Sequence, residues 1–82
     1  MYKAEVKIMP LPELLDPQGK AVESGLKNLS LDTLNNVRIG KFITIKVDAN
    51  SQEDAEDQVK EACKKMLHNP VIESYEFKVS KV

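Results

Sequence analysis

Near the start of the chain, Gly19 and Lys20 form a Gly-Lys pair at the beginning of an expected helix. Such a pair can bind phosphate through the free helical amides and the lysine ammonium group. Here Asp16 stands at the N-cap and Pro17 at the first helical position, so the carboxylate accepts from those amides and repels an anion. A Walker loop also needs Ser or Thr directly after the lysine, where Ala21 stands. The segment therefore predicts a helix that begins at Pro17 rather than a phosphate site.

Cys63 and His68 are the only thiol and the only imidazole, and both fall on a second expected helix. Cys63 lies on the apolar face of that helix, and His68 is the one nearby group that could act as an acid or base. We interpret Cys63 as a core thiol and His68 as a residue that suits the negative end of the helix. A single cysteine also excludes an internal disulfide framework and a cysteine-based zinc site, which fits a reducing cytoplasm.

Two groups of charged side chains remain as candidates. Four acidic residues lie in the first turns of the second helix, namely Glu53, Asp54, Glu56 and Asp57. They could suggest a metal site, but on a helix they fan outward, and the glycine of an EF-hand loop is absent. We interpret them as a solvated face. Arg38 and Lys41 flank Gly40 in the middle of an apolar extended segment, where a charge needs a partner. For this pair an intermolecular contact and a solvated position both stay open.

Composition limits the function classes further. The 82 residues carry a net charge of −1 with a pI of about 5.8, and Arg38 is the only arginine, so we expect no nucleic-acid binding. No apolar run approaches the roughly 20 residues that span a bilayer, and the N-terminus lacks a basic segment followed by an apolar stretch, so we expect neither membrane insertion nor export. We expect one domain over residues 1–82, with a core so thin that association would stabilise it.

Periodicity and helix signals predict the secondary structure. Apolar and charged residues alternate in a first strand, which Pro10 ends. Gly19 and Gly25 cost helix stability, so either another element packs closely against them or the two positions are simply tolerated; we favour close packing. Ser51 and Asp54 form a capping box at the start of the second helix. The sequence thus predicts a strand over 2–9, a helix from 17, an extended segment over 34–47, a helix from 51 to about 68 and a last strand over 71–82.

The middle segment keeps one apolar phase, because its odd positions from Val37 to Val47 are apolar except Lys41. We expect this row to face the helices or a partner. A two-residue turn at Gly40 would place two apolar rows on opposite faces, which disfavours a plain hairpin. A three-residue loop from Gly40 to Phe42 would preserve the phase, but we favour one long strand that bends at Gly40. Such a strand exceeds what one small sheet can pair, so we expect at least a dimer in which half of it pairs with a second subunit. The charged pair at the bend would then lie near the twofold axis.

Three segments stand out by their order and spacing along nearly the full chain. They are Leu15-Asp16-Pro17-Gln18-Gly19-Lys20-Ala21-Val22, Val37-Arg38-Ile39-Gly40-Lys41 and Asn69-Pro70-Val71-Ile72-Glu73-Ser74-Tyr75-Glu76. Together they resemble the PurS family, the small subunit of phosphoribosylformylglycinamidine synthase in bacteria and archaea. The chain departs from the family in two loops, where a Gly-containing turn and a Leu-Gly pair are usual and it has Leu11-Pro12-Glu13 and Leu29-Ser30.

The resemblance implies an α/β (α+β) fold. This is a two-layer sandwich with an antiparallel sheet and two helices on one face, in the order β-α-β-α-β, related to the ferredoxin-like fold and completed by dimerisation. It also implies a cytoplasmic subunit with no active site and no bound cofactor of its own. In that family a synthetase subunit (PurL) binds ATP, Mg²⁺ and the nucleotide, and a glutaminase subunit (PurQ) releases ammonia from glutamine. PurS brings the two together while formylglycinamide ribonucleotide becomes formylglycinamidine ribonucleotide in purine biosynthesis.

For the subunit interface we take charged and turn-forming residues of the three segments, namely Asp16, Gly19, Lys20, Arg38, Gly40, Lys41, Asn69 and Pro70. Two other classes of protein stay open. An ACT-type regulatory domain has similar size and element order, and it would bind an amino acid with a shift in melting temperature. An independent enzyme would need converging catalytic groups, which this sequence does not present. The sequence leaves a homodimer and a tetramer as alternatives.

Overall fold

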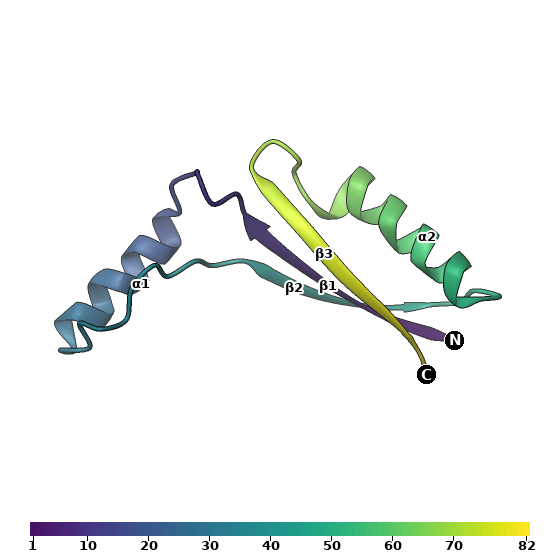
Figure 1. Cartoon of the computed structure of the whole chain (residues 1–82), viewed down its shortest axis with the longest axis horizontal. Coiled ribbons are helices and arrows are strands. Elements are labelled where there is room, and N and C mark those ends of the chain that lie inside the picture. Colours follow the sequence, from purple (N-terminus) through teal and green to yellow (C-terminus); the bar gives the residue numbers. More distant parts are fainter.

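The computed structural model describes residues 1–82. Its elements, in chain order, are β1 (Tyr2–Pro10), α1 (Pro17–Asn28), β2 (Lys41–Val47), α2 (Gln52–Ala62), a π-helical continuation of α2 (Cys63–Leu67) and β3 (Glu73–Lys81). The three strands form one antiparallel sheet in the order β2-β1-β3 (Figure 1). The predicted α+β class and the predicted element order are therefore confirmed.

One face of the sheet and α2 enclose the core. In the strand register, Ala4 of β1 lies opposite Ile45 of β2 and Val79 of β3, so alternate residues of the three strands share this inner face. α2 packs on this face (Figure 1), with Ala55 and Val59 in the core. Burial of this apolar set stabilises the fold; its members are Tyr2, Ala4, Val6, Ile8, Val47, Ala55, Val59, Cys63 and Val79.

Local caps determine where α2 begins and where the helical chain ends. The Ser51 hydroxyl accepts a hydrogen bond from the Asp54 amide (3.1 Å), and the Asp54 carboxylate accepts from the Asn50 amide (3.4 Å). Helical geometry stops at His68, whose φ of −135° and ψ of 157° are extended. Pro70 follows and disfavours helical geometry in the residue before it. Both predicted boundaries are confirmed.

The middle segment differs from the predicted long strand. β2 begins only at Lys41, and the residues before it form no strand. The structure also excludes a hairpin, since β2 is a single strand that pairs with β1 alone. Within β2 the predicted apolar phase is confirmed, because Ile43 and Ile45 pack on the core while Phe42, 61 % exposed, lies on the bare outer face.

Gly40 marks the point where this segment joins the sheet. A Cβ atom there would collide with the Ile8 carbonyl oxygen and the Met9 sulfur, so glycine lets the chain pass close to β1. Continuing the register would set Ile39 opposite Pro10, which has no amide hydrogen to donate. Strand pairing therefore stops at the position where the bend was expected.

Residues 17–36 extend from the sheet as an arm, and the three strands with α2 form a body (Figure 1). α1 has no substantial packing on the sheet or on α2 of its own chain, and the molecule measures 51 × 27 × 14 Å. In the single chain, α2 alone therefore covers the inner face. The sequence predicts both helices on one face, but α1 lies apart from it (Figure 1). Two stretches connect the arm to the body, residues 11–16 going out and residues 37–41 returning, and together we call them the hinge. The hinge directs α1 away from the body.

Candidate functional site

Asp16 sits where the hinge meets the arm and is almost fully buried, with 7 % of its surface exposed. One carboxylate oxygen accepts from the Gly19 amide (3.0 Å) as the predicted N-cap of α1, and the other accepts from the Ile39 amide (2.8 Å). The Gly19 amide first, then the Ile39 amide and the Arg38 guanidinium hold the pKa of Asp16 below its usual range, against the opposing effect of burial. The charged side chain thus ties the start of α1 to the segment that leads into β2.

Gly19 allows the two stretches of the hinge to approach closely. A Cβ atom at this position would collide with the Val37 carbonyl oxygen and the Asp16 carboxylate. The predicted close packing is therefore confirmed at Gly19. At Gly25 the same prediction is wrong, because a Cβ atom there would meet nothing within 4 Å. Gly25 is a tolerated cost on an exposed part of α1.

Arg38 spans the hinge from the returning stretch. Its Nη1 donates to the Leu14 carbonyl oxygen (3.1 Å), and its Nη2 donates to the Leu11 carbonyl oxygen (2.8 Å). The planar guanidinium offers both donors at once, which an ammonium group on a flexible stem does not. The sequence left an intermolecular contact and a solvated position open for Arg38, whereas its partners here are carbonyl groups of its own chain.

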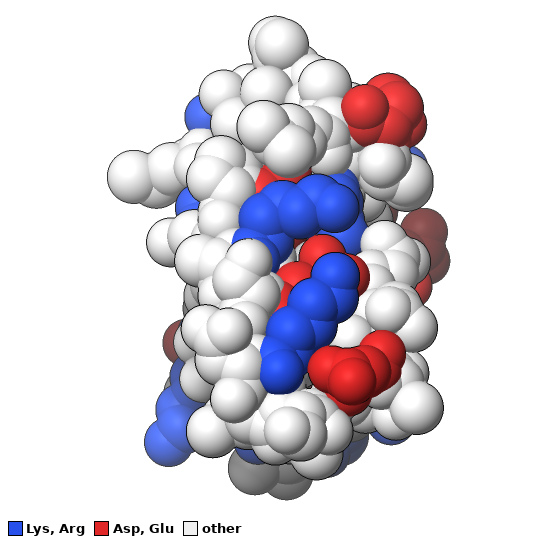
Figure 2. Space-filling model, turned by 90° about the vertical axis from the view of Figure 1, so that its left-hand side faces the viewer, with Lys and Arg blue, Asp and Glu red and all other residues white.

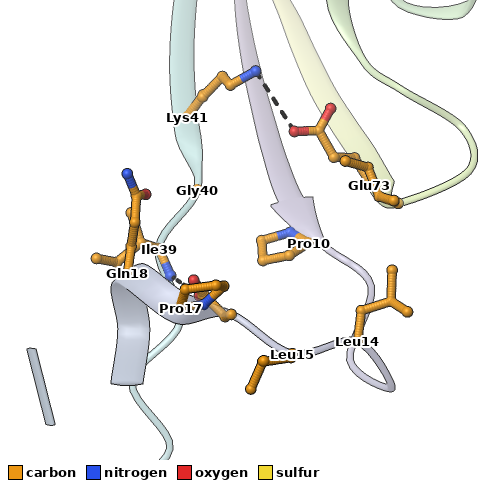
Figure 3. A pocket seen from close by; sticks show the side chains of 11 residues that line it. Pro10, Leu14, Leu15, Pro17, Gln18, Ile39, Gly40, Lys41 and Glu73 are labelled. Carbon is orange, nitrogen blue, oxygen red and sulfur yellow. Dashed lines mark hydrogen bonds and ion pairs between the residues drawn. The ribbon is translucent and has the colours of Figure 1, made fainter. Parts of the chain in front are cut away.

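Lys41 and the Asn69-Pro70 turn meet through Glu73, the first residue of β3. One Glu73 oxygen lies 3.5 Å from Lys41 Nζ (Figure 3), and the other accepts from the Asn69 amide (2.8 Å). The Asn69 amide and, to a smaller extent, Lys41 lower the pKa of Glu73. The Asn69 side chain also accepts from the Val71 amide (3.0 Å), which shapes the turn around Pro70. The turn before β3 is thus linked to the first residue of β2.

Most of the expected interface residues meet at this end of the body. Lys20 does not, since it lies on the surface of α1, 3.6 Å from Glu23. The other Glu23 oxygen accepts from the Asn36 amide (2.6 Å), which lowers the pKa of Glu23. Sequence reasoning missed the roles of Glu23 and Glu73, because the Asn36–Glu23 bond and the Lys41–Glu73 ion pair join distant residues and leave no local pattern. The expected residues that lie in the hinge or bond to it are Asp16, Gly19, Arg38, Gly40 and Lys41. The turn with Asn69 and Pro70 reaches the hinge only through Glu73, which pairs with Lys41, and through the Ile72 carbonyl oxygen, which accepts from the Leu11 amide.

An open cavity of about 300 Å³ lies between the hinge and β3. Figure 3 shows Leu14, Leu15 and Ile39 beside it, with the Lys41–Glu73 ion pair at its rim. No buried side-chain nitrogen or oxygen lacks a hydrogen-bond partner. The exposed lining of the cavity is mainly apolar, so the cavity suits contact with apolar side chains.

The arm carries large apolar side chains that are exposed in the single chain. Leu29 is 70 % exposed, and Val22, Leu31 and Leu34 are exposed as well; together we call these four residues the arm face. Figure 2 views the molecule from the arm end, where much of the surface is uncharged around a central strip of charged residues. Exposed apolar patches mark association surfaces. The run of leucines after α1 was the sequence signal for this surface.

Cys63 and His68 occupy structural positions, as the sequence indicates. Cys63 is fully buried, and burial raises the pKa of its thiol, which keeps it protonated. Nδ1 of His68 lies 2.6 Å from the Cys63 carbonyl oxygen, and the His68 ring packs against Tyr75 with centroids 4.6 Å apart. No three His, Cys, Asp or Glu side chains are grouped so that they could hold a metal ion. No helix has the length and apolar character needed to cross a membrane.

The chain is a small α+β protein that bonds its own hinge and leaves the arm face uncovered in the single chain. Comparison with known proteins specifies the class further. The sequence profile of PurS, described as phosphoribosylformylglycinamidine (FGAM) synthase, matches residues 3–81. The chain belongs to the PurS family, and its function is that of a subunit of FGAM synthase in purine biosynthesis.

Relatives and solved structures cover nearly the whole chain. The PurS subunit of Bacillus subtilis (strain 168) is 39% identical over 82 residues, which are 100% of this chain and 96% of that protein. Among solved structures, Methanocaldococcus jannaschii PurS is 39% identical and aligns with a TM-score of 0.89 over 100% of this chain and 99% of that chain. A chain in the structure of PurLQS from Thermotoga maritima is 32% identical, with a TM-score of 0.89 over 96% of each chain.

Proposed function

We propose that this chain works as a homodimer that joins the synthetase (PurL) and glutaminase (PurQ) subunits of FGAM synthase. Glutamine supplies ammonia at one larger subunit, ATP and Mg²⁺ bind at the other, and this chain contributes contacts rather than reacting groups. The similar chain in the PurLQS structure from Thermotoga maritima supports the bridging role. A single buried cysteine without a disulfide supports action in the cytoplasm.

The main support for a dimer is the arm face, because its side chains are apolar and exposed in the single chain. In a twofold dimer each arm lies on the other body, with α1 beside α2 on the inner face, where Ile43 and Ile45 of β2 are only partly buried. The stretch 37–39 then runs along the open edge of β2 in the other copy and covers it. In this exchange, α1 of the other copy covers the part of the inner face that α2 leaves open.

The hinge then lies near the twofold axis, as the sequence leads us to expect for the charged pair around Gly40. Gly40, Lys41, Asn69 and Pro70 contribute contacts between copies, Lys20 borders the arm face, and Asp16, Gly19 and Arg38 hold the hinge that presents them. A dimer is favoured over a tetramer, because a tetramer would also use the outer sheet face. That face carries charged side chains, including the Lys7–Glu76 pair at 3.4 Å.

Copurification of the larger subunits with a tagged form of this chain tests the bridging role. We expect the unsubstituted chain to hold both subunits in one complex and to support glutamine-dependent FGAM formation. Leu29→Glu, which places a charge on the arm face, should abolish both. Met66→Glu is the matched control, since Met66 is 85 % exposed and lies outside the arm face.

A complex of the two larger subunits that forms and works equally well without this chain would contradict the bridging role. The ACT-type alternative has no support, because similarity to PurS spans the whole chain.

A further inference from the structure

Only two stretches of chain join the arm to the body, and α1 has no substantial packing on the sheet that would hold the arm in place. Two side chains cross between these stretches. Asp16 reaches from the outgoing stretch to the Ile39 amide (2.8 Å). Arg38 reaches back from the returning stretch to the carbonyl groups of Leu11 (2.8 Å) and Leu14 (3.1 Å). The hinge is therefore bonded across from both sides.

Helix capping alone does not explain the geometry of Asp16. An N-cap needs only the bond from the Gly19 amide, which Oδ1 of Asp16 accepts. The second oxygen accepts from Ile39, a residue 23 positions away in the sequence. Arg38 likewise does more than a solvated charge, because it donates to two separate carbonyl groups. Neither side chain belongs to the core of the body, so losing one changes the hinge without opening the core.

The surrounding backbone leaves few other motions at the hinge. Pro10, Pro12 and Pro17 each fix φ in or beside the outgoing stretch. The Leu11 amide donates to the Ile72 carbonyl oxygen of the turn before β3 (2.9 Å), which anchors this stretch on the body. The remaining freedom is the angle of the returning stretch relative to the outgoing one. Asp16 and Arg38 are the side chains that close this angle.

We propose that Asp16 and Arg38 form a latch that fixes the angle between arm and body, and with it the spacing of the two bodies in the dimer. The inference rests on the proposed function. Because each arm lies on the other copy, this angle sets how far apart the surfaces that hold the larger subunits stand. Asp16 and Arg38 are therefore positioning residues for ammonia transfer between glutaminase and synthetase, and neither touches a substrate.

Pulsed dipolar electron spin resonance on the dimer tests the latch. A nitroxide attached at Glu56→Cys, an exposed position on α2, reports one distance between the two bodies, while buried Cys63 stays unlabelled. We expect a narrow distance distribution with the unsubstituted hinge. Arg38→Met and Arg38→Lys should both broaden or displace it, because lysine cannot bond both carbonyl groups. The control is Lys60→Met, which removes the same charge from an exposed position on α2.

Each outcome of this measurement decides a different claim. An unchanged distribution in both Arg38 variants overturns the latch, provided that circular dichroism shows a folded body. A distribution that broadens equally in Lys60→Met also overturns it, because loss of charge alone would then be the cause. Absence of any intersubunit distance with the unsubstituted hinge overturns the dimer, and the proposed spacing role with it.

The reconstituted complex gives a second readout that a merely structural role would not move. With Arg38→Met we expect the glutamine-dependent rate to fall about tenfold or more, since small misplacements of reacting sites have large effects. The rate with added ammonium salt and the amount of chain bound to the larger subunits should stay unchanged. An equal fall in both rates, or loss of binding, overturns the positioning role. Failure of the unsubstituted chain to bind would instead overturn the proposed function.

Discussion

The body and the arm keep their shapes by different forces. In the body, strand β1 and α2 bury an apolar core in which Ile8 is 1 % exposed. In α1, Gly19 is the only buried residue, and the arm and hinge are held by polar bonds of Asp16, Glu23 and Arg38. Hydrogen bonds give modest net stability, whereas apolar burial is the dominant favourable term. The body therefore has an apolar core of its own, whereas the arm is held by polar bonds and leaves its apolar face uncovered in the single chain.

Truncating one apolar side chain in each region should give the largest contrast. Ile8→Ala should lower the free energy of unfolding by about 2–5 kcal/mol, because it leaves a cavity in the core. Val22→Ala, at an exposed position of the arm face, should change the stability of a single chain by less than about 0.5 kcal/mol and weaken association instead. Urea unfolding at several protein concentrations separates the two effects. Equal losses of stability that do not depend on protein concentration would contradict the proposed difference between body and arm.

Adding one methyl group at each glycine of α1 tests how closely the chain packs at the two ends of this helix. Gly19→Ala should destabilise the protein by about 1–3 kcal/mol, because its Cβ atom would collide with the Val37 carbonyl oxygen. Gly25→Ala meets open space and should stabilise α1 by about 0.5–1 kcal/mol. Thermal unfolding of the two variants measures both the expected loss and the expected gain of stability. A neutral Gly19→Ala would mean that the hinge is not tightly packed.

Acid should loosen the arm before the body. The amides of Gly19 and Asn36 are the first causes of the lowered pKa values of Asp16 and Glu23, respectively. A lowered carboxyl pKa stabilises the folded form above the unfolded value of about 4, and this contribution is lost as the pH falls through the folded values. Amide NMR signals of the arm should therefore change below about pH 4, before those of the strands. The explanation would be contradicted if the amide signals of the arm and of the strands were lost at the same pH. It would also be contradicted if Asp16→Asn left the pH dependence of the arm signals unchanged.

Local patterns in the sequence predict the features that neighbouring residues determine. Asp16 before Pro17 predicts the start of α1, and Ser51 with Asp54 predicts the start of α2, because each cap depends on residues only a few positions apart. The alternation in the first strand predicts the inner face of the sheet in the same way. The apolar phase of β2 belongs to this class too, since it follows from strand geometry alone.

Contacts between distant residues could not be predicted in this way. The bonds from Ile39 to Asp16 and from Asn36 to Glu23 join residues 23 and 13 positions apart, and no periodicity encodes them. The apolar side of α1 predicts that something covers it, but a pattern cannot say which chain does so. For this reason the sequence predicts α1 on the sheet of its own chain, whereas α1 lies apart from that sheet.

Sedimentation equilibrium at micromolar concentration tests the central claim, that a second copy of the chain completes the arm face. We expect a mass of about twice the 9.2 kDa chain, because a twofold dimer buries the same surface on both copies. Leu29→Glu should reduce the mass to that of one chain, and Met66→Glu should leave it unchanged. A folded, monodisperse monomer of 9.2 kDa for the unsubstituted chain would contradict the claim.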